Sequence, residues 1–135
     1  MRVVFADAFY WIVMTVPHDP WVEIATRVGA ELGTPHLVTT DEVLAEFLSY
    51  LSSRGPYLRR LGAELVRRVL EDEEVTVLPQ SRESFLRGLN LFEERLDKGY
   101  SLVDCISMNA MRAEGIAEVF TNDHHFEQGG FVPLL

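Results

Sequence analysis

Four acidic residues could do chemistry because of the segments that surround them. Asp7 follows a short apolar run, residues 2–5, and precedes another apolar stretch that begins at Ala8. A carboxylate between two buried segments is costly unless it is paired, hydrogen-bonded or bound to a metal. Asp123 comes shortly after a second apolar run, residues 118–121. Either aspartate could instead cap the helix that follows it, so both interpretations stay open at each position.

The other two acids lie within expected helices. Asp104 follows Ser101 by three residues, which fits a capping box with the aspartate at the third helical position. Thr39 and Glu42 form a similar box at the start of another helix, which explains Glu42 but gives no local role to Glu46. A single glutamate on a helix usually faces solvent. No one of the four acids is decisive by itself.

Strand-like and helical segments alternate along the chain. Strands are predicted at four apolar runs, residues 2–5, 36–39, 75–78 and 118–121, with a short fifth strand near residues 131–132. Helical spacing of apolar residues predicts helices that begin near Asp19, Thr39, Tyr57, Ser81 and Ser101. This alternation predicts a three-layer α/β/α sandwich around a mostly parallel central sheet. No composition break marks a linker, so we expect residues 1–135 to form a single domain.

The predicted sheet brings the four acids together. Three follow strand ends or helix starts, which a parallel sheet gathers at its carboxyl edge, and Glu46 lies early on a neighbouring helix. Two carboxylates about 4 Å apart repel each other by about 4 kcal/mol at an effective dielectric constant of roughly 20, so such a cluster requires protons or a bound cation. Oxygen ligands favour Mg²⁺ or Mn²⁺ over Zn²⁺. A site of this kind can bind a phosphodiester and activate water against it.

Composition limits where we expect the protein to work. No segment reaches the roughly 18 uninterrupted apolar residues of a membrane span, so we expect no membrane association. The single cysteine, Cys105, cannot form an internal disulfide, which favours the reducing cytoplasm. We interpret Cys105 as a small buried residue and not as a nucleophile.

Charge is distributed unevenly along the chain. The formal net charge of −9 argues against binding nucleic acid through a uniformly basic surface. Residues 54–68 nevertheless form a local basic strip with only one acid, Glu64. Its basic residues are Arg54, Arg59, Arg60, Arg67 and Arg68. This strip is either a solvated helix face or a contact to the RNA backbone, for which Arg54, Arg59 and Arg60 are the candidates.

At the four acids the chain resembles the PIN domain family, and within it the VapC-like toxin branch. The resemblance spans nearly the whole chain and rests on the motifs Val-Val-Phe-Ala-Asp7, Leu-Val-Thr-Thr-Asp-Glu-Val-Leu-Ala-Glu46, Tyr-Ser-Leu-Val-Asp104 and Val-Phe-Thr-Asn-Asp123. It implies an α/β/α sandwich that binds one or two divalent cations, Mg²⁺ or Mn²⁺. It further implies hydrolysis of RNA by a metal-activated water, which leaves a 5′-phosphate and a 3′-hydroxyl.

The resemblance also implies roles for individual residues. Asp7, Asp104 and Asp123 match direct or water-mediated metal ligands. Glu46 matches a further ligand or the group that orients the water, and Thr121 matches a hydroxyl that often lines the site.

Two pairs of neighbouring residues are not explained by the family pattern. Ala8 and Phe9 stand where many relatives have a hydroxyl or amide side chain, which puts one supporting hydrogen bond in doubt. His124 and His125 are adjacent and point in different directions, and the pattern does not require them, so we assign them no metal-binding role.

The VapC-like resemblance implies partners as well as an activity. It implies a cognate antitoxin protein and a homodimer. The segment from residue 51 to residue 70 carries Tyr57, Leu58, Leu61 and Leu65, more apolar side chains than a compact domain must bury, so we expect the dimer contact there.

Three other functions are alternatives to that of a toxin ribonuclease. The chain could be a PIN nuclease of RNA processing outside a toxin–antitoxin system. It could also be a non-catalytic PIN scaffold, but scaffolds typically lose one or more of the acids. A response-regulator receiver needs a lysine after its last strand, and the only lysine here, Lys98, precedes the fourth predicted strand.

Overall fold

The computed structural model describes residues 1–135, which form five strands and seven helices. In chain order the elements are β1 (Val3–Ala6), α1 (Ala8–Thr15), α2 (Val22–Glu31), β2 (His36–Thr40), α3 (Asp41–Leu51), α4 (Pro56–Glu71), β3 (Val75–Leu78), α5 (Arg82–Glu94), α6 (Leu102–Glu114), β4 (Glu118–Phe120), α7 (His124–Gln128) and β5 (Val132–Pro133). All five predicted strands are present, and their ends differ from the prediction by at most one residue.

The strands form one sheet in the order β3-β2-β1-β4-β5, and every neighbouring pair is parallel. Strand β1 is central, with Phe5 aligned to Val38 of β2 and to Val119 of β4. Its apolar run does not alternate because both of its faces are covered. The chain extends the sheet from β1 first through β2 and β3 and later, on the other side, through β4 and β5. Such a reversal opens a crevice at the carboxyl ends of β1 and β4.

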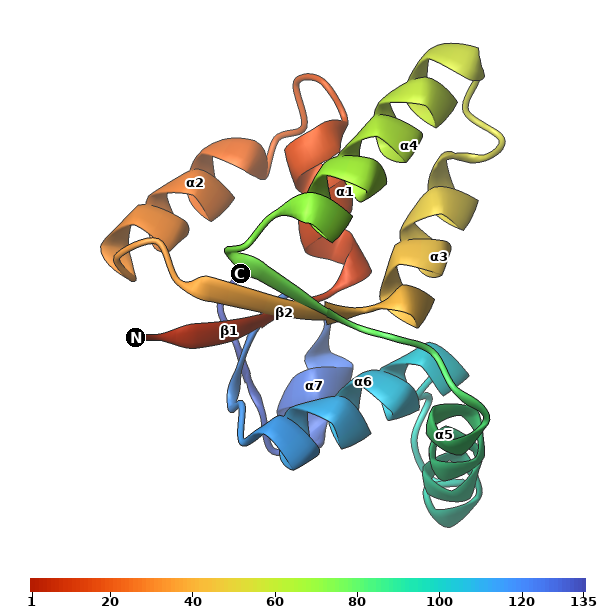
Figure 1. The fold of residues 1–135 in the computed structure, drawn as a ribbon. Coiled ribbons are helices and arrows are strands. Elements are labelled where there is room, and N and C mark those ends of the chain that lie inside the picture. Colours follow the sequence, from red (N-terminus) through yellow and green to blue (C-terminus); the bar gives the residue numbers. More distant parts are fainter.

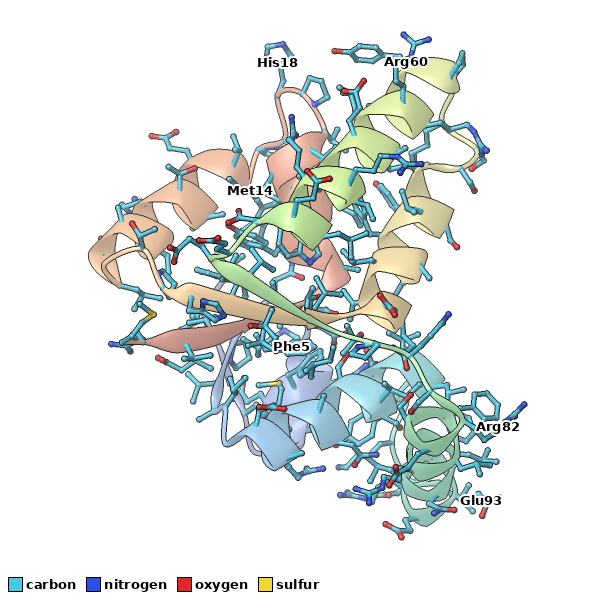
Figure 2. The ribbon with its side chains drawn as sticks, in the orientation of Figure 1. Phe5, Met14, His18, Arg60, Arg82 and Glu93 are labelled. Atoms are coloured by element: carbon cyan, nitrogen blue, oxygen red, sulfur yellow. The ribbon has the colours of Figure 1, made fainter.

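Helices cover both faces of the sheet. Figure 1 shows α1, α2, α3 and α4 on one face and α5, α6 and α7 on the other, which confirms the predicted α/β/α sandwich. Phe5 is fully buried at the centre of the molecule, between the two helical layers (Figure 2). None of the helices combines the length and the apolar composition that crossing a membrane requires.

Apolar spacing does not predict helix α1, which the sequence indicates only as a helix that Asp7 could cap. Residues 9–14 are all apolar or aromatic, so they show no amphipathic period from which a helix could be recognised. In the structure Trp11 and Val13 are buried, and Tyr10 stacks on Phe120 with ring centroids 4.7 Å apart. Asp7 occupies the N-cap position of α1, but its side chain makes no capping hydrogen bond. The carboxylate of Asp7 is therefore available for another partner.

The start of α3 corrects the predicted capping box of Thr39 and Glu42. The N-cap is Thr40, whose hydroxyl accepts a backbone N–H of the first helical turn at 3.0 Å. Thr39 still belongs to β2, and its buried hydroxyl donates to the carbonyl of Ala6 at 2.8 Å. Glu42 instead accepts a hydrogen bond from the hydroxyl of Ser84 at 2.9 Å. Two successive threonines fit the start equally well, and only the packing of the strand decides between them.

The apolar faces of α4 and α5 are buried to different extents. Leu58 and Leu65 of α4 are partly buried against the core, so this segment leaves less apolar surface exposed than we expected. The large exposed apolar side chains of this part of the chain are Tyr57 and Leu70 on α4, Phe85, Leu86 and Phe92 on α5, and Leu96 just beyond α5. Periodicity predicts α5 as an amphipathic helix but does not say that much of its apolar face stays uncovered.

Candidate metal centre

The structure brings the four predicted acids to one edge of the sheet. Asp7 follows β1, Asp104 is the third residue of α6, Asp123 precedes α7, and Glu46 lies in the middle of α3. Asp7, Glu46 and Asp123 line one open pocket of about 560 Å³. Asp104 adjoins this pocket through His125, whose Nδ1 lies 3.2 Å from Oδ2 of Asp104.

Asp7 is the most buried of the four acids, with 6% of its surface exposed. Its Oδ2 accepts a hydrogen bond from the hydroxyl of Thr121 at 3.1 Å. Its Oδ1 is buried and has no hydrogen-bond partner, and the following residue, Ala8, has no polar side chain to offer. Leaving a charged buried oxygen without a partner is destabilising. The backbone N–H of Ala8 and the hydroxyl of Thr121 favour the ionised carboxylate, but burial outweighs them, so a proton or a cation would stabilise this oxygen.

Two of the acids, Asp7 and Glu46, have a raised pKa. Burial raises the pKa of Asp7 to about 7, and the negative charges of Glu46 and Asp104 act in the same direction. Burial likewise raises the pKa of Glu46, with further contributions from the charges of Asp104 and Asp123. Groups that repel in this way are stabilised together by one positive ion.

Asp104 combines the capping role with a place in the site. The hydroxyl of Ser101 accepts the N–H of Asp104 at 3.0 Å, and Oδ2 of Asp104 accepts the N–H of Ser101 at 3.0 Å, which confirms the predicted capping box. On the side chain of Asp104, the bond from the N–H of Ser101 and the contact to His125 both involve Oδ2. Oδ1 stays outside them and is the oxygen that could bind a ligand. Capping and metal binding are therefore compatible at Asp104.

Asp123 is held in a similar way at the end of β4. It is the N-cap of α7, and its Oδ1 accepts the backbone N–H of His125 at 2.9 Å. Its own N–H donates to the hydroxyl oxygen of Thr121 at 3.2 Å. The side chain of Thr121, which is completely buried, thus contacts both Asp7 and Asp123.

Sequence reasoning assigned no role to either histidine, and the structure separates the two. The side chain of His124 is 88% exposed, whereas that of His125 is 34% exposed. One ligand atom each from Asp104, Asp123 and His125 lie within 4.8 Å of one another. The signal that could have indicated His125 is its place two residues after Asp123, because an N-cap aspartate accepts the N–H at that position and holds the residue close.

This set of donors fits a hard divalent cation. Carboxylate oxygens predominate, and they come from Asp7, Asp104, Asp123 and Glu46, with one imidazole nitrogen beside them. Sets dominated by carboxylates suit Mg²⁺ and Mn²⁺ better than Zn²⁺. The unpartnered buried Oδ1 of Asp7 supports the same conclusion.

The three arginines of the predicted RNA contact lie outside the pocket. Nε of Arg54 donates to the carbonyl of Tyr50 at 3.0 Å, and its guanidinium lies 3.9 Å from the centroid of the Tyr50 ring. Arg59 donates to the carbonyl of Ser52 at 2.8 Å. Arg60 extends from the outer end of α4 (Figure 2). None of the three lines the pocket of the acids.

Comparison with known proteins agrees with this fold. The chain is 29% identical over 134 residues to the 23S rRNA-specific endonuclease VapC20 from two strains of Mycobacterium tuberculosis, and the match covers 98% of each chain. The crystal structure of Mycobacterium tuberculosis VapC20, described as a Sarcin-Ricin loop cleaving toxin, matches with a TM-score of 0.83 at 24% identity and covers 96% of each chain. Residues 6–132 match the family profile of the PIN domain. Because this profile spans nearly the whole chain, the chain belongs to the PIN domain family.

Proposed function

We propose that this protein is an endoribonuclease that hydrolyses RNA phosphodiesters with Mg²⁺ or Mn²⁺. The observation that carries the proposal is the way in which three aspartates are held. One oxygen of each of Asp7, Asp104 and Asp123 accepts a hydrogen bond from the protein. The other oxygen of Asp7 is buried without a partner. Carboxylates arranged in this way are prepared for a cation and are destabilising without one.

The proposed division of labour follows from where the acids lie. A divalent cation supplies the positive charge that the phosphodiester requires and lowers the pKa of water. Asp7, Asp104 and Asp123 would hold this cation directly or through water. Glu46 borders the same pocket from α3, so its carboxylate can accept a hydrogen bond from the attacking water and orient it. Burial raises the pKa of Glu46, which makes it a better proton acceptor.

RNA as the substrate and a toxin role are supported by similarity. The matched relative is named a 23S rRNA-specific endonuclease, and its crystal structure is described as that of a toxin. We propose that the present chain is likewise the toxin of a toxin–antitoxin pair and is held in check by a cognate antitoxin protein. We also propose a cytoplasmic location, because RNA substrates lie there and because Cys105 is a free, buried thiol.

A PIN nuclease of RNA processing is the alternative activity, since it would use the same acids. A non-catalytic PIN scaffold is less well supported. It would not need three acids that line one pocket with a fourth beside it, nor an Asp7 whose pKa burial raises to about 7.

The basic strip and the dimer are further parts of the proposal. Arg54, Arg59 and Arg60 would contact the RNA backbone outside the cleavage position, because they lie away from the acids. The exposed apolar side chains of α4 and α5 would be covered in a homodimer.

The test of the activity is cleavage of RNA by the purified protein. We expect cleavage with Mg²⁺ or Mn²⁺, loss of cleavage with EDTA, and recovery when excess metal is returned. The products should carry a 5′-phosphate and a 3′-hydroxyl. Products that end in a 2′,3′-cyclic phosphate would show a mechanism without an activated water and would contradict the proposal.

The toxin role needs a separate test in cells. Induced expression of the wild-type chain should arrest growth, and co-expression of the antitoxin encoded beside it should relieve the arrest. The Asp7→Ala variant should not arrest growth. Arrest by Asp7→Ala at a matched protein level would show that toxicity does not come from this site.

A further inference from the structure

His125 contacts two of the proposed metal ligands, which come from different parts of the chain. Its ring Nδ1 lies 3.2 Å from Oδ2 of Asp104 and 3.4 Å from Oδ1 of Asp123. Its backbone N–H donates to the same Oδ1 of Asp123 at 2.9 Å. Asp104 belongs to α6 and Asp123 to the turn before α7, and these two helices are neighbours (Figure 1). His125 thus connects the two carboxylates directly.

The contacts of His125 restrict the orientation of each carboxylate. On Asp104 they involve Oδ2, which also accepts the N–H of Ser101 at 3.0 Å. On Asp123 they involve Oδ1. A carboxylate that is bound at one oxygen presents the other in a defined direction, which is how residues around a metal site orient its ligands.

The imidazole ring itself is held by its surroundings. Tyr100, which is 5% exposed, packs edge-to-face against it with ring centroids 5.6 Å apart and planes at 74°. On another side is Gly99, where a Cβ atom would lie only 3.3 Å from Nε2 of His125. A ring nitrogen that contacts a carboxylate at this distance donates to it, so the neutral ring carries its proton on Nδ1.

The neighbouring His124 has none of these contacts. Its side chain is 88% exposed, and its one ionic neighbour is Glu127, 3.9 Å away. The two adjacent histidines therefore provide an internal comparison, with the same residue type on the same short helix and only one of them joined to the acids.

We propose that His125 is a positioning residue that holds Asp104 and Asp123 in the arrangement that binds the cation. The inference rests on the proposed function, because it assigns a role within the same site. Without the Nδ1 donor, Oδ2 of Asp104 loses one of its partners. The Asp104 carboxylate can then turn away from Asp123, whose negative charge repels it. Changes in residues that orient metal ligands typically weaken metal binding about 10- to 100-fold.

Two substitutions of His125 separate the position of the donor from the bulk of the ring. In His125→Asn the amide nitrogen takes the place of Nδ1, so the donor to Asp104 is kept. In His125→Gln the amide nitrogen takes the place of Nε2, so a polar side chain remains but the donor is misplaced. His124→Gln is the matched control. Circular dichroism and thermal unfolding check that each variant folds.

The measurement is Mn²⁺ binding by titration calorimetry, with the free ion followed by electron paramagnetic resonance. We expect His124→Gln to bind as the wild type does, His125→Asn to bind within about 3-fold of it, and His125→Gln to bind about 10- to 100-fold more weakly. Equal affinity of His125→Gln and the wild type would overturn the inference, as would equal weakening in His125→Asn and His125→Gln. Electron spin echo signals from a histidine nitrogen bound directly to Mn²⁺ would overturn it too, since His125 would then be a ligand.

Failure of the inference can be told apart from failure of the proposed function. If the wild-type protein binds no Mn²⁺ and no Mg²⁺, both the proposed metal-dependent activity and the proposed role of His125 are contradicted. If the wild type binds Mn²⁺ and cleaves RNA while His125→Gln binds equally tightly, only the role of His125 is lost.

Discussion

The hydroxyl of Thr121 donates a hydrogen bond of 3.1 Å to Oδ2 of Asp7, although the two residues are 114 positions apart in the chain. The same hydroxyl oxygen accepts the backbone N–H of Asp123 at 3.2 Å. One buried side chain thereby joins the carboxylate of Asp7 after β1 to the backbone of Asp123 after β4, and both of these acids line one pocket.

Replacing Thr121 with valine should weaken metal binding at nearly unchanged side-chain volume. Thr121→Val removes the donor to Asp7, and we expect Mn²⁺ affinity to fall about tenfold or more. The free energy of unfolding should fall by about 1–3 kcal/mol because a buried acceptor loses its partner. Thr39→Val is the control, since the Thr39 hydroxyl is equally buried but donates to the carbonyl of Ala6. It should lose stability and keep its Mn²⁺ affinity, and a similar loss of affinity in both variants would contradict the role of Thr121.

The stability of the metal-free protein should fall as the pH rises toward 7. Burial raises the pKa of Asp7 from 3.8 to about 7, so between these values the folded protein keeps a proton that the unfolded chain has released. The contribution of Asp7 is fully present below pH 3.8 and is lost as the pH rises through about 7, at up to about 1.4 kcal/mol per pH unit and about 4 kcal/mol in total.

Asp7→Asn removes this titration, so in EDTA the variant should be more stable than the wild type at pH 8, and the difference should shrink toward pH 4. Urea unfolding at several pH values measures it. Glu93→Gln, at an exposed position of α5 (Figure 2), should follow the wild type at every pH. A difference between Asp7→Asn and the wild type that does not change with pH would mean that Asp7 is already ionised in the folded metal-free protein.

Two acids with hydrogen bonds to serines should differ sharply in their effect on cleavage. Asp104→Asn should reduce turnover by at least about 100-fold, because it removes a charge beside the cation site while an oxygen remains for the Ser101 cap. Glu42→Gln should keep most of the activity and lose at most about 1 kcal/mol of stability, because the Glu42 carboxylate accepts a hydrogen bond from Ser84 and lies outside the pocket of the acids. Single-turnover cleavage with excess enzyme measures both. If Asp104→Asn were active and Glu42→Gln inactive, the proposed site would be on the wrong helix.

The proposed homodimer should be visible by light scattering at micromolar concentration as roughly twice the chain mass of 15.4 kDa. Phe92→Ser on α5 and Tyr57→Ser on α4 each make an exposed apolar position polar without opening the core. The variant that lowers the mass toward 15.4 kDa identifies the contact. A strictly monomeric wild type would remove the dimer from the proposal and would leave the catalytic site untouched.

Most secondary structure could be predicted from the sequence because its causes are local. The strands of the sheet are short apolar runs, and the start of α6 follows from the Ser101 and Asp104 side chains, which bond to each other's backbone. Helix α1 was missed because apolar residues on all of its faces remove the amphipathic period. The N-cap of α3 was placed one residue early because Thr39 and Thr40 offer the same hydroxyl.

The sequence by itself determined the α/β/α fold class and the positions of Asp7, Asp104 and Asp123 at strand ends and helix starts, because periodicity and short-range hydrogen bonds are properties of neighbouring residues. Only the tertiary structure decided which oxygen of each carboxylate is free, that Thr121 joins Asp7 to Asp123, and that His125 and not His124 reaches Asp104. It also decided that the apolar face of α5 stays exposed. These features depend on how elements far apart in the chain pack against one another, and the pattern of any one segment does not contain that information.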